Sequence, residues 1–130
     1  SKLMILDRNK GIHTVMGSRF KTLNPVKSSL DWGNFMFTSF FNILFGSNHK
    51  DVLCCAKAFY LDEILIDRIN SSGFDIDIEL LSLLTIKNKR KFITQISLDY
   101  KRRSKKEGKK LKISDGWAIL IRVFKMIKYL

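Results

Sequence analysis

The sequence predicts an α/β fold in which short strands alternate with helices. Three β-favouring runs, at residues 12–16, 52–60 and 92–100, are bounded by turn-forming residues, as strands usually are. Helical patterns lie between them at residues 31–45, 61–70 and 75–87, and a further one closes the chain. Strands and helices that alternate along one chain are typical of a sheet flanked by helices.

Composition indicates one globular domain. The chain has 130 residues, of which 45% are hydrophobic and 28% are charged, and these values exclude a disordered protein. Cys54 and Cys55 are adjacent and have no second pair, so we expect reduced thiols and no disulfide framework. The two histidines, His13 and His49, do not complete a zinc-binding pattern.

The first strand, at residues 12–16, ends at the turn Gly17-Ser18-Arg19. The helix at 31–45 follows a loop; Ser29 or Asp31 could cap it, and Gly46 could end it. This helix is strongly aromatic but too short and too interrupted to cross a bilayer. It could belong to the core or lie on a membrane surface, and its aromatic stripe favours the core.

The remaining helical patterns differ in strength. Residues 75–87 begin with acidic side chains, as the helix dipole prefers, while residues 61–70 predict only a short helix. Residues 3–6 are apolar and resemble the end of a helix. Because the chain also opens without a methionine, we expect it to be a piece of a longer protein.

A dense basic tract occupies residues 101–112. It contains eight Lys or Arg residues, opposed only by Glu107, and so supplies +7 (eight minus one) of the net charge of +12. Gly108 lies within it, and a cationic loop that contains glycine can wrap phosphate oxygens. The charge alone favours a solvated surface run, although a focused cationic patch can also attract nucleic acid, anionic lipid or phosphorylated small molecules.

The C-terminal segment, residues 114–130, predicts an amphipathic helix. Arg122, Lys125 and Lys128 are three residues apart, so they fall along one face, and most of the other residues are apolar. Such a helix can lie among lipid headgroups. It can equally pack on another part of the domain, and the sequence leaves both possibilities open.

Four short motifs stand in a fixed order along the chain. They are Gly17-Ser18-Arg19; Asp51 with Lys57-Ala58-Phe59; Gly73-Phe74-Asp75-Ile76-Asp77-Ile78-Glu79; and Tyr100-x-x-Arg103-Ser104 with Glu107-Gly108-Lys109-Lys110 and Asp115-Gly116. In this order they resemble the second half of family 2 glycosyltransferases of the dolichol-phosphate mannosyltransferase and polyprenyl-phosphate sugar transferase type. The resemblance runs from about Gly11 to the C-terminus.

The resemblance implies a GT-A architecture, with a mixed sheet flanked by helices and a C-terminal amphipathic helix. It makes residues 1–130 the acceptor-side half of an enzyme that transfers a sugar from a nucleotide-diphosphate sugar to a polyprenyl or dolichyl phosphate. The nucleotide-binding half and its metal-binding Asp-x-Asp precede these residues in the family. A divalent Mg or Mn ion is therefore expected in the complete enzyme, with ligands mostly outside this segment, and the segment alone is expected to be inactive. The implied location is the cytoplasmic face of a membrane, either peripheral or anchored.

Five basic residues match phosphate- or substrate-binding positions of the family: Arg19, Lys57, Arg103, Lys109 and Lys110. Attack of a lipid phosphate on a sugar bonded to a diphosphate brings several negative charges together, so fixed cations have an electrostatic role. The resemblance makes Arg103 a catalytic residue of the phosphate loop. Without the resemblance, Arg19 reads equally well as a surface residue in a turn.

Three carboxylates match the family's acidic positions. Asp51 is a candidate base or sugar-hydroxyl ligand, although a phosphate acceptor hardly needs a base. Asp77 and Glu79 lie two apart on a helix, so they point to different faces, and Glu79 is the preferred catalytic carboxylate. The alternatives are a loop aspartate and acids that favour a helix N-terminus. Cys55 and Ala56 depart from the family's glycine and aromatic residue, which puts the shape of the sugar pocket in doubt.

Two other functions compete with lipid-phosphate glycosylation. A family 2 enzyme could use a polysaccharide or another glycan as acceptor, but the Gln-x-x-Arg-Trp motif of processive synthases is absent. A basic nucleic-acid-binding module would interleave aromatic residues with its cations for base stacking, and residues 101–112 contain none.

Overall fold

The computed structural model describes residues 3–19, 29–64, 66–88, 93–99 and 112–130. All of the basic tract except Lys112 lies outside these residues. The elements in chain order are η1 (Arg8–Lys10), β1 (Thr14–Ser18), α1 (Ser29–Phe45), β2 (Lys57–Phe59), η2 (Leu61–Glu63), η3 (Ile66–Arg68), α2 (Ile76–Lys87), β3 (Ile93–Ser97) and α3 (Ile113–Ile127), where η denotes a 3-10 turn.

The strands form a mixed sheet in the order β2-β1-β3. β1 is antiparallel to β2, with Thr14 opposite Phe59, and parallel to β3, with Thr14 opposite Ile93. All five residues of β1 are buried, as the central strand of a covered sheet requires. The predicted α/β class and the mixed sheet flanked by helices are confirmed.

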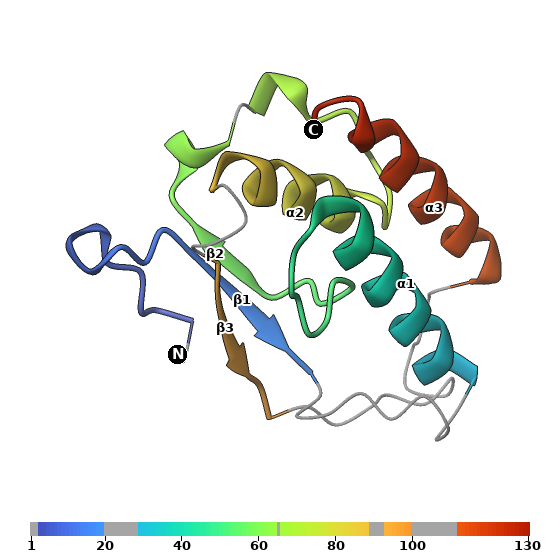
Figure 1. Ribbon diagram of the computed structural model, residues 1–130, viewed down its shortest axis with the longest axis horizontal. Helices are drawn as coiled ribbons and strands as arrows, with labels where there is room; N and C mark the ends of the chain where they lie inside the picture. The colour runs from blue at the N-terminus through green and yellow to red at the C-terminus, as the bar shows by residue number, and fades with distance from the viewer. Residues whose placement is uncertain (1–2, 20–28, 65, 89–92, 100–111) are drawn as a thin grey trace.

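Figure 1 shows α1, α2 and α3 gathered to one side of the sheet, with α3 farthest from it. Side chains from β1 and from all three helices make one core, because each helix turns an apolar stripe inward. Burial of each such side chain stabilises the fold by about 1.5–3 kcal/mol. The buried members are Met16, Phe41, Phe45, Val52, Ile78, Leu81, Ile119, Val123 and Met126.

Helix α1 ends at Phe45, and Gly46 adopts the positive φ of 56° that the predicted stop requires. The rings of Phe41 and Phe45 are stacked 4.3 Å apart in the core. Trp32 is nevertheless 56% exposed and Ile43 is 79% exposed. The expectation that this aromatic stripe is core is therefore right for one face of the helix and wrong for the other.

The predicted strand at 52–60 is much shorter in the structure, where only Lys57–Phe59 pairs with β1. The preceding residues turn instead, and the amide of Cys54 donates to the carbonyl of Asp51 at 3.3 Å. Val52 enters the helical core rather than the sheet. The β-favouring composition of this stretch reflects burial of a loop.

The predicted helix at 61–70 is wrong, since two 3-10 turns occupy this stretch. Ile64 between them is extended, with φ −123° and ψ 133°. Its side chain is buried whereas Leu61 is exposed, so the described side chains of this segment do not form the predicted helical stripe.

The predicted helical end at residues 3–6 is also wrong. Met4 to Leu6 have no regular structure, and Asp7 then forms an antiparallel bridge with Ile12. Gly11, with φ 73°, closes the turn between them. The apolar residues near the start of the chain lead into a tight loop, not out of a helix.

Helix α3 covers most of the predicted segment 114–130 and begins slightly earlier, at Ile113. Asp115 determines this start, because its Oδ2 accepts a hydrogen bond of 2.6 Å from the amide of Lys112. Ile119, Val123 and Met126 face the core. The helix is therefore amphipathic as predicted, and its inner face packs on the domain.

Candidate functional site

Strand β1 delivers Arg19 at its carboxyl end, and the side chain meets Asp51 from the loop after α1. The Nε and Nη2 atoms of Arg19 donate to the two carboxylate oxygens of Asp51, each at 2.8 Å. The backbone amide of Arg19 adds a third bond at 3.0 Å. Asp51 is fully buried, while the side chain of Arg19 is 25% exposed. The pair thus presents part of a fixed guanidinium at the edge of the sheet.

Helix α1 contributes Asn34 to the same cluster. Its Nδ2 donates to Oδ1 of Asp51 at 3.3 Å. Because the carboxylate only accepts hydrogen bonds, the amide must turn its nitrogen toward it, and its oxygen then points elsewhere. That oxygen is buried and has no hydrogen-bond partner among the residues that the structure describes. We refer to Arg19, Asn34 and Asp51 as the Asp51 cluster.

The loop that carries Asp51 is held by the side chain of Asn42. Its Nδ2 donates to the carbonyl of His49 at 2.9 Å, and its Oδ1 accepts from the amide of His49 at 2.8 Å. The same oxygen accepts from the hydroxyl of Ser47 at 2.9 Å. One residue of α1 thereby satisfies both backbone groups of His49, two residues before Asp51.

A second ion pair lies beside this cluster. Nζ of Lys57 is 3.0 Å from Oδ1 of Asp77, and it also donates to the carbonyl of Cys54. The side chain of Lys57 is only 3% exposed, whereas that of Asp77 is 24% exposed. Lys57 therefore joins β2 to the start of α2, and Asp77 is the more accessible member of the pair.

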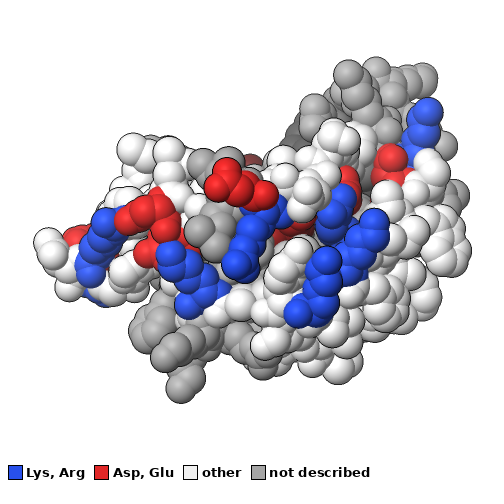
Figure 2. All heavy atoms as spheres, turned by 90° about the horizontal axis from the view of Figure 1, so that it is seen from above, with Lys and Arg blue, Asp and Glu red and all other residues white. Residues whose placement is uncertain are grey.

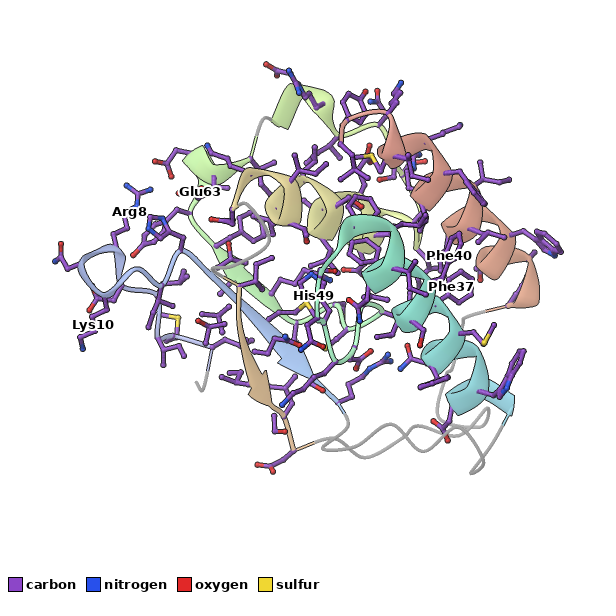
Figure 3. All side chains as sticks on the ribbon, in the orientation of Figure 1. Arg8, Lys10, Phe37, Phe40, His49 and Glu63 are labelled. Carbon is purple, nitrogen blue, oxygen red and sulfur yellow. The ribbon has the colours of Figure 1, made fainter. Side chains whose placement is uncertain are left out.

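His49 is buried between these polar groups and the core, near the centre of the view in Figure 3. Its Nε2 is 3.1 Å from the hydroxyl of Thr85, which itself donates to the carbonyl of Leu81. Nε2 must then be the protonated nitrogen, which leaves Nδ1 buried and without a partner in the described part of the chain. Burial, together with the charge of Lys57, lowers the pKa of His49 to about 4.

The two cysteines have different surroundings. Cys54 is buried, and burial raises the pKa of its thiol. Cys55, at the position where the resemblance leads one to expect glycine, is exposed. Its side chain is therefore accommodated without displacing the core.

Glu79 has other partners than those expected of a catalytic carboxylate. It accepts hydrogen bonds from the amides of Asn70 and Ser71, the latter at 2.8 Å, and from the hydroxyl of Ser71. Nη1 of Arg122 approaches it at 3.5 Å. The fully buried carboxylate thus fastens the loop before α2 and does not contact the Asp51 cluster. Of the two acidic residues Asp77 and Glu79, it is Asp77 that contacts Lys57.

Arg122 is not part of an exposed cationic stripe. It pairs with Asp75 at 2.8 Å as well as with Glu79, and its side chain is 15% exposed. Lys125 is exposed, and so is Lys128, which caps the helix. The predicted stripe of three cations is therefore wrong at its first member, because two carboxylates near the start of α2 draw Arg122 inward.

Arg103, Lys109 and Lys110 lie outside the described residues. The place from which their segment departs is nevertheless defined. β1 and β3 are parallel, so their carboxyl ends meet at one edge, and the amide of Leu98 donates to the carbonyl of Ser18 at 2.9 Å. Residue 99 therefore lies at the same sheet edge as Arg19.

The residues that the structure describes do not fit a metal site. They contain no group of three or more His, Cys, Asp or Glu side chains placed to hold an ion. Arg19 and Asn34 occupy both oxygens of Asp51. The cluster instead offers a guanidinium, which suits a phosphate or another anion.

Sequence reasoning missed Asn34, Asn42 and Arg122. A polar residue inside a strongly aromatic helix is the available signal for Asn34 and Asn42, since such residues are usually buried for a hydrogen bond. The sequence pattern was misleading for Arg122, because its spacing to Lys125 predicted an exposed cationic face rather than a partly buried ion pair.

Among the described residues, no helix has the length and apolar character needed to cross a membrane. Comparison of the chain with protein-family models, with curated proteins and with solved structures found no match.

Proposed function

We propose that the chain is the acceptor-side half of a GT-A glycosyltransferase that transfers a sugar from a nucleotide-diphosphate sugar to a polyprenyl or dolichyl phosphate. The supporting observation is the contact between Arg19 and Asp51, which are 32 residues apart and belong to two different motifs. A second pair, Lys57 and Asp77, joins the second motif to the third. Residues singled out by the resemblance thus meet in pairs.

In this proposal Arg19 binds phosphate and Asp51 is a positioning residue. Three donors from Arg19 and one from Asn34 surround the Asp51 carboxylate, so it can fix the guanidinium plane but has little capacity left to accept a substrate proton. The basic tract, which follows residue 99 along the chain, would supply Arg103, Lys109 and Lys110 to the remaining phosphate oxygens.

The proposal includes partners that this chain does not provide. A divalent Mg or Mn ion and the nucleotide would be bound by the other half of the catalytic domain, and the acceptor would be presented at the cytoplasmic face of a membrane. Glu79, which the resemblance suggests as catalytic, would instead hold the loop before α2.

A transfer assay tests the proposal. The protein, produced with the coding sequence that precedes Ser1, is incubated with labelled UDP- or GDP-sugars and polyprenyl phosphate, and lipid-linked sugar is counted. Arg19→Lys keeps the charge but loses the planar fork, so we expect roughly a 10²-fold loss of kcat. Asp51→Asn should lower kcat with little change in KM for the sugar donor. Absence of transfer with every nucleotide sugar, or full activity of Arg19→Lys, would contradict the proposal.

A further inference from the structure

The outer face of α1 is apolar, although its inner face is partly polar. Asp31, Asn34 and Thr38 are buried on the inner side. The large side chains on the outer side are exposed: Trp32, Phe35, Met36 and Ile43. A helix of a domain surrounded only by water shows the opposite arrangement.

Helix α3 continues this apolar surface. Its outward residues are Trp117, Ile121 and Phe124, together with Lys125, and Lys128 follows at its end. The rings of Phe40 and Phe124 meet edge to face at 5.5 Å, so the two helices lie side by side there. We call the exposed side chains of both helices the outer surface: Trp32, Phe35, Met36, Ile43, Trp117, Ile121, Phe124, Lys125 and Lys128.

The charge of the outer surface indicates whether a second copy of the chain or an anionic surface is the better binding partner. Among the described residues of α1 and α3, the exposed ones include no Asp or Glu. In Figure 2 the right-hand part of the described surface, the side on which α1 and α3 lie in Figure 1, is mostly white, with several blue and a few red side chains. A second copy would place lysines opposite lysines, whereas an anionic surface would neutralise them.

We propose that the outer surface binds an anionic phospholipid bilayer and lies in its headgroup region. Exposed tryptophans favour the interface between headgroups and acyl chains, and lysines beside them pair with lipid phosphates. Two helices side by side bury more apolar area than α3 alone, which makes the contact stronger. The inference deepens the proposed function, because a polyprenyl-phosphate acceptor lies in a bilayer.

Tryptophan fluorescence can report binding of the outer surface to vesicles. The chain has two tryptophans, and both belong to the outer surface. The full chain is mixed with vesicles of phosphatidylcholine alone, or of phosphatidylcholine with phosphatidylglycerol, without nucleotide sugar or polyprenyl phosphate. With the anionic vesicles we expect a blue shift of tryptophan emission and protection from acrylamide. Trp32→Phe and Trp117→Phe should each leave a tryptophan that responds.

Matched variants separate the outer surface from other exposed groups. Ile43→Asp places a charge at a 79% exposed site on α1, and Leu61→Asp does so at a 71% exposed site on η2. We expect only Ile43→Asp to weaken binding. Lys125→Ala and Lys128→Ala should each lower vesicle affinity about fivefold. Lys10→Ala, at the opposite end of the molecule in Figure 3, should leave it unchanged.

Three results would overturn the inference. One is vesicle binding without a tryptophan response, which would assign the interaction to the basic tract. Another is equal loss of binding in Ile43→Asp and Leu61→Asp. The third is a dimer in sedimentation that Ile43→Asp converts to a monomer, which would make the surface an interface between copies. The vesicles contain no substrate, so the two experiments are independent. A negative vesicle result would contradict membrane binding by the outer surface but not sugar transfer. A negative transfer assay would contradict the proposed function but not vesicle binding.

Discussion

Asn34 donates a hydrogen bond of 3.3 Å to Asp51, while its own side-chain oxygen is buried and no described residue donates to it. An unsatisfied buried carbonyl costs free energy, about 1–3 kcal/mol. The helix that displays apolar residues to the outside thus carries an unpaired acceptor within it. This acceptor lies next to the only carboxylate that contacts Arg19 in the residues described.

The first prediction concerns this amide. Asn34→Asp would place a second carboxylate against Asp51 in a buried position, so we expect the free energy of unfolding to fall by about 2 kcal/mol or more. Asn34→Ala loses one hydrogen bond but also removes the orphaned oxygen, so its cost should be smaller. Urea denaturation at neutral pH gives both values, and equal midpoints for Asn34→Asp and the wild type would refute the geometry.

The second prediction concerns the basic tract. Under the proposed function, Arg103→Ala and Lys109→Ala should each abolish sugar transfer by the complete protein, because the proposal assigns both residues to phosphate binding. Lys105→Ala and Lys106→Ala alter the same tract at positions outside the motif and should retain activity. Circular dichroism checks that all four variants fold. Wild-type turnover in Arg103→Ala and Lys109→Ala would remove their assigned role.

The third prediction tests Arg122 as the link between α3 and α2. Arg122→Ala would leave Asp75 and Glu79 largely buried without their cation, and breaking such a network costs about 3 kcal/mol. Lys125→Ala, on the exposed side of the same helix, should change stability by less than about 0.5 kcal/mol. Chemical unfolding of the two variants provides the comparison, and similar losses would mean that the ion pairs contribute little.

The fourth prediction is a pH dependence. The pKa of His49 is lowered from 6.5 to about 4 in the folded chain. As the pH falls through this window the unfolded chain binds a proton that the folded chain does not, so stability decreases. The full effect is about 3 kcal/mol between pH 6.5 and 4. His49→Gln should flatten this part of the profile, and identical slopes in both proteins would argue against a neutral buried imidazole.

The fifth prediction uses two glycines. A Cβ at Gly17 would lie 2.5 Å from Cδ1 of Leu98 and 3.1 Å from Cβ of Ala56, so Gly17→Ala should destabilise the sheet by about 1–3 kcal/mol. Gly33, within α1, has no neighbour within 4 Å of such an atom. Gly33→Ala should therefore stabilise the helix by up to about 1 kcal/mol. The thermal midpoint should fall in Gly17→Ala and rise in Gly33→Ala, and a shift of both midpoints in the same direction would contradict this prediction.

Long periodic patterns predicted the fold well, because burial alone determines them. The helix at 75–87 corresponds to α2, and the run at 92–100 contains β3. The predicted strand at 52–60 was too long, because its first part belongs to the loop from Asp51 to Ala56. A loop that packs into a core can have the same apolar composition as a strand. Residues 61–70 show a related effect, since apolar residues in and between two 3-10 turns have the spacing of a helical stripe.

The site was predictable only in part. Motif order singled out Arg19 and Asp51, and the structure brings them into contact. Sequence spacing could not separate the roles of Asp77 and Glu79, because both fit the start of a helix. Their roles depend on what the tertiary fold sets opposite each: Lys57 in one case, the 70–71 backbone and Arg122 in the other. Such partners come from distant parts of the chain.

The clamp that Asn42 forms around His49 has a consequence for variation in related sequences. The stretch from Gly46 to Lys50 spans a fixed gap, tied at one end by the glycine turn and near the other by both backbone groups of His49. One residue inserted or deleted there would shift the carboxylate away from the guanidinium that it orients. Natural relatives that share this arrangement should therefore tolerate many changes of side chain in this stretch, but none of length.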